Sequence, residues 1–381
     1  MRILIDARMY GLEHAGIGRY VVNLVNQLQN LDEENYYSLL VRKNTKLEDL
    51  KSNFKSLEID IPHYSLREQT RLPQILNGLG FDIAHFPHFN VPIFFNRPYV
   101  LTIHDLIKHT SRGMPTTTKG PVLYWLKYLG YKIVFGSAIT RAKKIIVPSK
   151  TIKGELLKSY KIPSQKVEVI YEGVDKVFYS ELRVTNYELR KILAKYKIKD
   201  PYAIYTGSAY PHKNLERLIQ AIGLLGSNNL QLVIVSARNS FLDRVVGYAR
   251  KYGVENRVKF LGFVEDSELG QLYANAKAFV SPSLSEGFGL PGLEAMASGC
   301  PVLCSDIPVF HEIYADSAIY FNPYDVQDIV SKINQVLRFD ESILRNKVTL
   351  GKERAKQFSW RKMAEETIRV YKDAMGYNFG K

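Results

Sequence analysis

Short apolar runs alternate with segments of helical periodicity along nearly the whole chain, and this alternation limits the folds open to it more than any other feature. The runs predicted to form buried strands lie at 3–6, 36–41, 83–86, 99–103 and 144–147, and again at 202–206, 230–235, 258–260, 278–281 and 301–304. Helices are predicted between them, for example at 18–28 and 67–76. Strands connected through helices form parallel sheets, so the sequence predicts an α/β protein with two doubly wound halves.

The length of the chain and a charged segment near its middle predict two domains. A chain of 381 residues exceeds one ordinary core at roughly 150 residues per domain. A further strand finishes within 167–175, and the strand pattern starts again after a charged, helix-prone stretch at 181–199. We therefore expect one domain at 1–180, a second at 181–357 and a C-terminal segment at 358–381 whose helix is capped by Ser359. A cleft between two such domains is the expected place for a ligand.

The composition is that of a globular protein with an anionic partner. Hydrophobic residues make up 46% and charged residues 24% of the chain, and residues 1–8 resemble a buried strand more than a signal peptide. No stretch approaches the roughly 20 apolar residues needed to cross a bilayer, and we expect a cytoplasmic protein. The net charge of +14 favours an anionic ligand or surface. No nucleic-acid-reading motif is recognised, so we expect no nucleic-acid partner.

One segment combines basic and aromatic side chains in a way that suits a lipid headgroup region. Its basic residues are Lys119, Lys127, Lys132, Arg141, Lys143 and Lys144, and the aromatic residues among them are Tyr124, Trp125, Tyr128 and Tyr131. Long cationic chains and amphipathic rings lie well together at such a boundary. We expect an anionic membrane surface as a partner, with the protein peripheral on the inner face of the membrane. A buried core helix with a solvated basic face is the alternative.

In open parallel sheets ligands bind beyond the carboxyl ends of the strands, so the loops after strands hold the candidate site residues. After the first strand, Gly16 and Gly18 precede the predicted helix and Arg19 lies beside them. These residues suit a phosphate or sugar contact, although the dinucleotide fingerprint is incomplete. After the fourth strand, His104 can donate to a substrate hydroxyl, with Asp105 placed to orient it. A histidine that only satisfies loop carbonyls is the alternative.

The second half carries a lysine in the corresponding place. Gly207, Ser208 and Lys213 lie in the loop after its first strand. Lys213 offers a point charge suited to a pyrophosphate, whereas a lone surface lysine is commonly only solvated. The lysine gains significance because another loop at the same edge carries a glutamate.

That glutamate, Glu286, is followed eight positions later by a second one, Glu294. The loop after Glu286 contains two glycines that allow close backbone approach and consists of Gly287, Phe288, Gly289 and Leu290. Pro291 then suits the first turn of a helix. A carboxylate beside a helix N-terminus suits a ligand that is both hydroxylated and anionic, such as a nucleotide-activated sugar. The alternative is a strand, a turn and a capped helix.

Taken together, these segments resemble the retaining glycosyltransferases of family 4. The resemblance covers nearly the whole chain and rests on the order and spacing of Gly16-Ile-Gly18-Arg19-Tyr20, His85-Phe-Pro-His-Phe-Asn90, His104-Asp-Leu106, Val147-Pro-Ser149, Glu172-Gly-Val-Asp175, Gly207 to Asn214, Ser285 to Ala297 and Phe358-Ser-Trp360. Glu286 and Glu294 match the family's Glu-x7-Glu element, and the stretches 64–73 and 85–90 are closest to mannosyltransferase-like members.

The resemblance implies the GT-B architecture of two facing Rossmann-like domains. In that architecture 1–180 is the acceptor side, 181–357 is the donor side, and the helix of 358–381 packs back on the N-terminal domain. It implies a hexosyltransferase that moves a sugar, which we expect to be mannose, from a GDP- or UDP-linked donor to a lipid-linked or surface-polysaccharide acceptor. The alternative is a nucleotide-sugar-binding protein without transfer activity.

The resemblance also implies roles for individual residues. Glu286, His104 and Lys213 are the expected catalytic residues, with Glu286 at the donor sugar and His104 near it. Glu294 is expected to contact the nucleotide ribose. We expect no cofactor besides the donor and no metal site, and the chain has no Asp-x-Asp element.

One position departs from the family pattern. Many relatives carry an arginine directly after the glycine at Gly207, where this chain has Ser208, and others carry one where His212 stands. The diphosphate site is therefore expected to have one cation fewer. Arg238 and Arg19 are the candidates to replace it.

Overall fold

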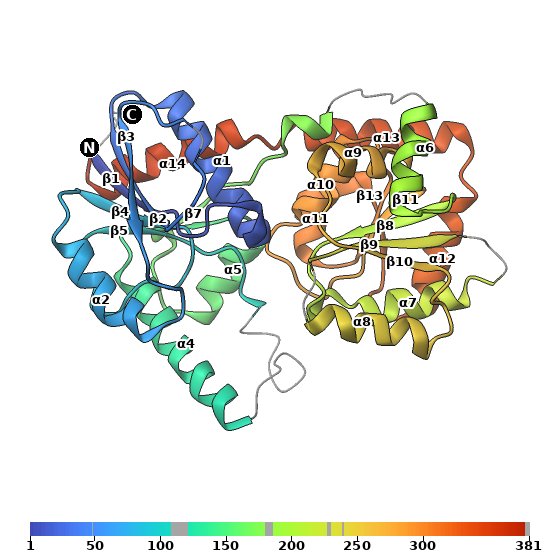
Figure 1. Ribbon diagram of the computed structural model, residues 1–381, viewed down its shortest axis with the longest axis horizontal. Helices are drawn as coiled ribbons and strands as arrows, with labels where there is room; N and C mark the ends of the chain where they lie inside the picture. The colour runs from blue at the N-terminus through green and yellow to red at the C-terminus, as the bar shows by residue number, and fades with distance from the viewer. Residues whose placement is uncertain (48, 108–120, 180–185, 227–229, 238–239, 378–381) are drawn as a thin grey trace. The chain divides into compact units, whose positions relative to one another are not determined.

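The computed structural model describes residues 1–47, 49–107, 121–179, 186–226, 230–237 and 240–377. These residues divide into two compact units (Figure 1). Unit 1 comprises Met1–Leu106, Lys119–Gly173 and Trp360–Lys381, and Val174–Ser359 make up most of unit 2. The boundary expected between 180 and 181 lies outside the described residues, and the two units meet in sequence at Gly173 and Val174 and again at Ser359 and Trp360.

Unit 1 is built on a parallel sheet with seven strands among the described residues. In spatial order they are β3 (Phe54–Ile59), β2 (Tyr36–Arg42), β1 (Arg2–Asp6), β4 (Ile83–Phe86), β5 (Tyr99–Thr102), β6 (Lys144–Val147) and β7 (Val167–Val169). In β1, Ile3 lies beside Tyr37 of β2 and Ile83 of β4. Ile3, Leu4 and Ile5 are all at most 1% exposed. Burial on both faces explains why such strands are continuous apolar runs in the sequence.

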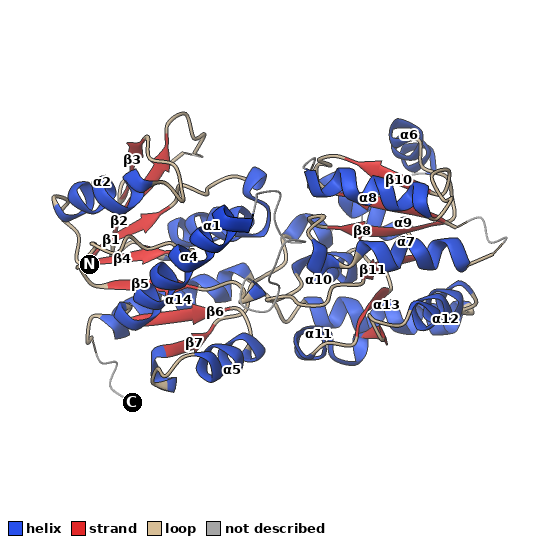
Figure 2. Ribbon diagram, turned by 90° about the horizontal axis from the view of Figure 1, so that it is seen from below, coloured by secondary structure: helices blue, strands red, loops and turns tan. Residues whose placement is uncertain are grey.

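Helices cover both faces of this sheet (Figures 1 and 2). On one face, α1 (Ala15–Leu31) and α14 (Trp360–Ala374) pack against each other. On the other lie α2 (Leu66–Asn77), α4 (Pro121–Arg141) and α5 (Lys150–Ser159). A hydrophobic core fills the space under these three helices, where Leu72 of α2, Phe135 of α4 and Leu156 of α5 are fully buried. Short 3-10 turns occur at η1 (Leu12–His14) and η3 (Ser164–Lys166).

Unit 2 repeats the scheme with a parallel sheet of six strands among its described residues. Their spatial order is β10 (Val258–Leu261), β9 (Gln231–Val235), β8 (Tyr202–Thr206), β11 (Ala278–Ser281), β12 (Val302–Ser305) and β13 (Ala318–Phe321). The helices are α6 (Asn186–Tyr196), α7 (Leu215–Leu224), α8 (Ser240–Lys251), α9 (Asp266–Asn275), α10 (Leu290–Ala297), α11 (Pro308–Tyr314), α12 (Val326–Leu337) and α13 (Glu341–Ala355). Further 3-10 turns are η4 (Lys176–Tyr179), η5 (Pro211–Lys213) and η6 (Ala315–Ser317). The predicted α/β fold with two parallel sheets is confirmed.

Two strands at sheet edges were not predicted. β3 lies at the edge of the first sheet and β13 at the edge of the second. An edge strand has one neighbour and keeps polar side chains on its outer positions, and β3 accordingly carries Lys55 and Glu58. β13 has only four residues, two of them half-buried. Neither strand therefore shows the long apolar run that marks a strand in the sheet interior.

The start of α1 differs from the prediction and explains one of its glycines. The helix begins at Ala15, so Gly16 and Gly18 lie in its first turn rather than before it. Gly18 is buried, and a Cβ atom there would collide with the carbonyl oxygen of Gly11 in the turn that precedes the helix. Gly16 is exposed, and a Cβ atom there would meet open space. The close approach of the chain therefore requires glycine at 18 only.

We expect Gly18→Ala to destabilise unit 1 by about 1–3 kcal/mol, because the added methyl group must push the Gly11 carbonyl away. The matched control is Gly16→Ala, which should be neutral or stabilise the helix by up to ~1 kcal/mol. Urea unfolding followed by tryptophan fluorescence measures this, since both tryptophans, Trp125 and Trp360, belong to unit 1. Equal effects of the two substitutions would contradict the packing argument.

Candidate functional site

A lysine and a glutamate from neighbouring loops meet at the carboxyl edge of the unit 2 sheet. Lys213 lies in η5 after β8, and Glu286 follows β11, the strand beside β8 in the sheet. The Nζ atom of Lys213 lies 2.6 Å from Oε1 of Glu286. The two side chains are 16% and 14% exposed, so the pair is shielded but still reaches solvent. The structure thus brings together two residues that were predicted separately.

Asn214 fixes the lysine loop against the glutamate loop. Its backbone adopts the left-handed conformation, with φ 58° and ψ 30°, and it directly follows Lys213. Its side-chain amide donates to the carbonyls of Pro282, at 3.0 Å, and Pro323, at 2.8 Å. The Leu284 N–H donates to the His212 carbonyl at 2.8 Å. These bonds join three loops at one edge of the sheet and hold Lys213 in place.

Glu286 is an ionised carboxylate in a shielded place. Burial acts to raise its pKa, but the charges of Lys213 and His212 and the hydrogen bonds from Lys213 and Ser283 outweigh burial, and the pKa lies below its ordinary value. The fully buried Ser283 donates its hydroxyl to Oε1 of Glu286 at 2.7 Å. The carboxylate therefore carries its charge at neutral pH.

Gly207 brings bare backbone to the same edge. It adopts φ 147°, and a Cβ atom there would lie 2.9 Å from the hydroxyl of Tyr205. That hydroxyl donates to the Ser208 carbonyl at 2.7 Å, which fixes the turn after β8. Ser208 is thus held through its backbone. Arg238, one of the two cations proposed to compensate for the missing arginine, lies outside the described residues.

The loop after Glu286 ends in a helix start that only glycine permits. Gly289 has φ 99° and is the N-cap of α10, and the Tyr314 hydroxyl donates to its carbonyl at 2.5 Å. A Cβ atom on Gly289 or on Gly292 would collide with that hydroxyl. The helix begins at Leu290, four positions after Glu286, so the N-terminus of α10 lies close to that carboxylate in the sequence.

The other predicted residues of this loop lie inside unit 2. Phe288 is buried and packs edge-on against Phe358, with ring centroids 5.6 Å apart, so its side chain supports the loop from below. Leu290 is buried in the first turn of α10, and Gly287 lies in the loop. Glu294 lies one turn further along α10 and is 3% exposed.

His104 of unit 1 is held from both sides of its ring. Its Nδ1 atom lies 3.2 Å from Oε1 of Glu172, and its Nε2 atom lies 3.0 Å from the Pro87 carbonyl oxygen. The edge of the ring meets Tyr20, with ring centroids 4.8 Å apart. Since both polar partners are acceptors, only the doubly protonated ring can donate to both.

The carboxylate at His104 corrects one prediction. Asp105 was expected to orient the ring, but Glu172 lies against Nδ1, and Asp105 is exposed. β5 ends at Thr102, so His104 and Asp105 lie in the loop beyond the strand, where Glu172 reaches the ring from a separate segment of the chain. Glu172 stood in a recognised motif, Glu172-Gly-Val-Asp175, but no role was assigned to it.

A hydrogen-bonded chain supports His104 from behind. The Thr102 hydroxyl lies 3.2 Å from the Tyr20 hydroxyl and 2.8 Å from Nε2 of His85, whose Nδ1 lies 2.6 Å from the Tyr371 hydroxyl. Burial, with a smaller contribution from the charge of His104, lowers the pKa of His85 to about 3. His85 is therefore neutral and structural.

A buried charge cluster below the unit 1 edge was not predicted. Arg8 is 1% exposed and binds Asp6 with two nitrogens, at 2.7 and 2.6 Å. One of these nitrogens also donates to the fully buried Glu68 at 2.8 Å, and Nδ1 of His63 lies 3.2 Å from Glu68. The signal available in the sequence was Asp6-Ala-Arg8, two charges at the end of a buried strand.

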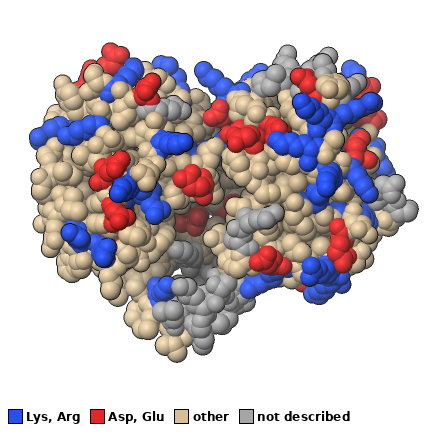
Figure 3. Space-filling model, viewed as in Figure 1, with Lys and Arg blue, Asp and Glu red and all other residues tan. Residues whose placement is uncertain are grey.

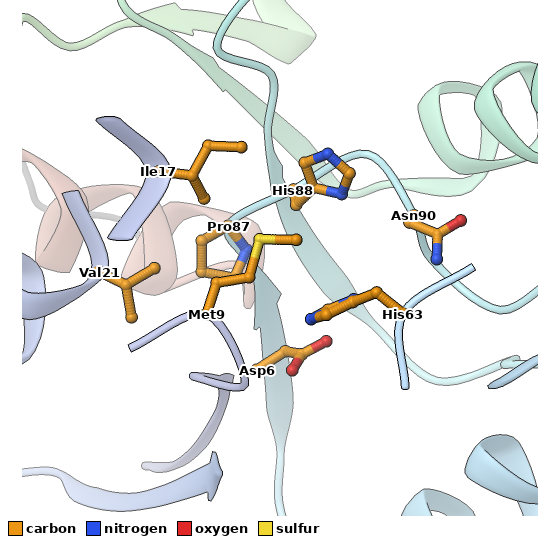
Figure 4. Close-up of a pocket in the computed structure, with 8 residues that line it drawn as sticks. All are labelled: Asp6, Met9, Ile17, Val21, His63, Pro87, His88 and Asn90. Atoms are coloured by element: carbon orange, nitrogen blue, oxygen red, sulfur yellow. The ribbon is translucent and has the colours of Figure 1, made fainter. Parts of the chain in front are cut away.

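A small pocket opens above this cluster (Figure 4). Its lining comes from β1 and the loop after it, from α1, from the segment between β3 and α2, and from the loop after β4. The lining residues are Asp6, Met9, Ile17, Val21, His63, Pro87, His88 and Asn90. Among the three residues predicted from α1, Gly16 is exposed, Gly18 is buried and Arg19 is half-buried. The pocket lies at the carboxyl ends of β1 and β4, where the sheet rule places ligands.

Unit 2 also has a groove beyond β10. It has a volume of about 540 Å³ and is lined by Ser240, Leu242, Asp243, Val246, Phe260, Leu261 and Gly262. This volume falls in the range of about 300–1,000 Å³ that is usual for small-molecule sites. No prediction pointed to it, because its lining residues carry no motif.

Two further searches cover only the described residues. None of the described helices is long and apolar enough to cross a membrane. The same part of the chain holds no group of three or more His, Cys, Asp or Glu side chains arranged to bind a metal ion.

Comparison with known proteins identifies both halves of the chain. The model of Glycosyltransferase Family 4 matches residues 14–177, and that of Glycosyl transferases group 1 matches residues 188–353. The O-antigen chain mannosyltransferase RfbU of Salmonella typhimurium is 30% identical over 261 residues, which span 68% of this chain and 65% of that protein. The O-antigen chain mannosyltransferase B of Escherichia coli is 29% identical over 392 residues, spanning 98% of this chain and 100% of that protein.

A solved structure shares the fold. Sucrose-phosphate synthase from Thermosynechococcus elongatus superposes with a TM-score of 0.79 at 20% identity, covering 99% of both chains. At this level of identity the likeness concerns the fold alone.

We expect Lys213→Met to destabilise unit 2 by about 3 kcal/mol at pH 7, because it leaves the Glu286 carboxylate shielded and uncompensated. In the native protein the lowered pKa of Glu286 contributes stability above its ordinary value of 4.5, and this stability is lost as the pH falls through the lowered pKa. In the variant the charge and hydrogen bond of Lys213 are lost while burial still acts to raise the pKa of Glu286, so the pKa rises and the penalty shrinks towards acid pH. Differential scanning calorimetry at pH 7 and pH 5 measures both effects.

The double variant Lys213→Met with Glu286→Gln is the matched control for this prediction. Removal of the carboxylate charge should recover most of the lost stability at pH 7. A double variant as unstable as Lys213→Met would show that packing of the lysine, and not charge compensation, is responsible.

Proposed function

The chain belongs to the family 4 glycosyltransferases, and we propose that it transfers a mannosyl residue, with retention of configuration, from a nucleotide-diphosphate sugar to a glycan acceptor of a surface polysaccharide. The observation that carries this proposal is the shielded pair of Lys213 and Glu286 beside the N-terminus of α10. It combines a cation, an ionised carboxylate and the N-terminus of a helix at one sheet edge. A donor with a diphosphate and a hydroxylated sugar requires these three kinds of group.

In the proposed reaction the positive groups act on the leaving diphosphate. The bond between the anomeric carbon and the phosphate oxygen breaks, and its electron pair leaves with the nucleoside diphosphate. Lys213 and the N-terminus of α10 stabilise the negative charge that develops there. Lys213 already lies in a fixed loop, so little reorganisation is needed when the diphosphate binds.

The carboxylate acts on the sugar. Glu286 accepts hydrogen bonds from sugar hydroxyls while the anomeric carbon gains positive charge, and Ser283 keeps the carboxylate oriented. The acceptor oxygen forms the new bond to the anomeric carbon from the face that the diphosphate leaves, and its proton passes to a phosphate oxygen of the leaving group. This route needs no second carboxylate as nucleophile.

Two further residues keep the proposed roles that the family resemblance implies. Glu294 on α10 contacts the nucleotide ribose, and His104 lies near the transferred sugar. Glu172 and the Pro87 carbonyl orient the His104 ring, as the distances of 3.2 and 3.0 Å support. Glu172 is thus a positioning residue for His104.

The proposed sugar and acceptor follow from the relatives. Both matching curated proteins described above are O-antigen chain mannosyltransferases by name, and one of them is covered over its whole length. GDP-mannose is therefore the proposed donor, and a growing surface glycan, free or lipid-linked, is the proposed acceptor. A lipid-linked acceptor would require the protein to work beside a membrane.

We expect Glu286→Gln to lower the rate of mannosyl transfer about 10²- to 10³-fold, because the neutral amide cannot stabilise the developing positive charge. The matched control is Glu353→Gln, which removes an exposed ion pair of similar length, 2.9 Å to Lys356, on α13. It should leave the rate unchanged. The measurement is release of nucleoside diphosphate from a panel of GDP- and UDP-linked sugars.

The panel separates the parts of the proposal. Release of UDP but not of GDP would reject the mannose donor and leave the glycosyltransferase assignment intact. A Glu286→Gln variant with the native rate would reject the catalytic role of the carboxylate.

A further inference from the structure

Tyr314, the last residue of α11, contacts the first turn of α10 from inside unit 2. Its side chain is 1% exposed, and its hydroxyl donates to the Gly289 carbonyl at 2.5 Å. Gly289 is the N-cap of α10, and Figures 1 and 2 show α11 beside that helix. The same carbonyl accepts the Gly292 N–H at 3.1 Å. One hydroxyl from a separate helix is therefore part of the hydrogen bonding that starts α10.

Two glycines at the start of α10 leave the room that this hydroxyl occupies. A Cβ atom on Gly289 or on Gly292 would lie well inside contact distance of the Tyr314 hydroxyl oxygen. The φ of 99° at Gly289 favours glycine in any case. Gly292 lies within the helix, where alanine is more stable than glycine unless something else needs the space. The contact with Tyr314 therefore explains the glycine at position 292.

The backbone on both sides of Tyr314 is held by other elements. The Ile313 carbonyl accepts a hydrogen bond from Nε of Arg354 on α13 at 2.8 Å. The Ala315 carbonyl accepts one from the Tyr320 hydroxyl on β13 at 2.6 Å. Because these two carbonyls are tied to different elements, the end of α11 is fixed in position. Tyr314 can thus transmit that position to α10.

The side chain of Tyr314 is fixed as well. Its ring stacks on Phe310, with the ring centroids 4.9 Å apart and the planes at 21°. Burial raises the pKa of Tyr314 well above its ordinary value, and the carboxylate of Glu286 acts in the same direction. The hydroxyl therefore stays protonated at neutral pH and remains a hydrogen-bond donor to Gly289.

We propose that Tyr314 is a positioning residue of the donor site, which holds the N-terminus of α10 in the direction that suits a bound diphosphate. This inference rests on the proposed function, in which that N-terminus and Lys213 stabilise negative charge on the leaving diphosphate. The attraction between an anion and a helix N-terminus falls off within the first turn, so a small displacement of this turn weakens it. Tyr314 is buried behind the turn and acts through α10.

The charges around the donor site make this positioning important. Figure 3 shows basic and acidic side chains interspersed over the visible face of unit 2, so that face gathers no patch of one sign. At the sheet edge, Lys213 is itself paired with Glu286 at 2.6 Å, which compensates part of its charge. The fixed end of α10 adds a second positive contribution at a site where one cation fewer was expected.

Binding of GDP and of UDP to the full chain, measured by isothermal titration calorimetry, tests the proposal. Tyr314→Phe keeps the ring and removes only the hydroxyl. We expect it to raise the Kd of the nucleoside diphosphate that the native chain binds by about fivefold, the factor that one buried hydrogen bond commonly represents. Gly292→Ala disturbs the same contact from the helix, because its methyl group displaces the hydroxyl, and should raise the Kd at least as much.

The matched control is Tyr202→Phe. Tyr202 is fully buried in unit 2 and its hydroxyl donates to the Leu272 carbonyl at 2.7 Å, but it lies at the amino end of β8, away from Lys213. Each of the two phenylalanine variants loses one buried hydrogen bond, so both should lower the Tm by about 2–4 °C. Only Tyr314→Phe should change the Kd.

The possible results separate this inference from the proposed function. A native Kd in Tyr314→Phe and Gly292→Ala, or an equal rise in Tyr202→Phe, would overturn the positioning role and leave the proposed function intact. A native chain that binds neither GDP nor UDP would overturn the proposed function, and the role of Tyr314 with it.

Discussion

The pairing of β8 with β11 is the constraint on which the proposed donor site depends. These strands are 71 or more residues apart in sequence, yet parallel pairing places their carboxyl ends side by side. Lys213 and Glu286 follow those two ends, and Asn214 donates to the Pro282 carbonyl in the loop of Glu286 and to the Pro323 carbonyl in a third loop. The ion pair is therefore a consequence of sheet order. The same order explains how a shielded cation and carboxylate can coexist without leaving either charge uncompensated.

Unit 1 also holds charged side chains away from solvent, but with different residues. Arg8, Asp6 and Glu68 are buried together, and both carboxylates bind the one guanidinium group of Arg8. His104 instead lies between a carboxylate and a carbonyl at the sheet edge, with both ring nitrogens engaged. The fully buried charges thus compensate one another below the edge, and the partly exposed groups at the edge are the candidates for chemistry.

The sequence allowed us to predict the fold and to single out individual residues, but not to predict which side chains contact each other. Strands in the sheet interior are continuous apolar runs and were found, whereas β3 and β13 at the edges have no such run. Glu286 and Lys213 were found because glycine-rich loops after strands have a recognisable composition. The pairing of His104 with Glu172 was missed because it links residues 68 positions apart, and no local pattern encodes the path that brings them together. Gly18 was selected for ligand contact, but its steric requirement comes from Gly11.

The C-terminal helix gives the order in which the chain can complete its fold during synthesis. Tyr371 of α14 lies 2.6 Å from His85 of β4, across 286 residues of sequence, and Trp360 packs edge-on near Tyr20 of α1. Unit 2 lies almost entirely within Val174–Ser359. Because the ribosome makes the chain from its N-terminus, residues 174–359 of unit 2 have all been made before α14 of unit 1. The half that begins first is therefore completed after the other, and α1 covers its face of the sheet without α14 until residues 174–359 have been made.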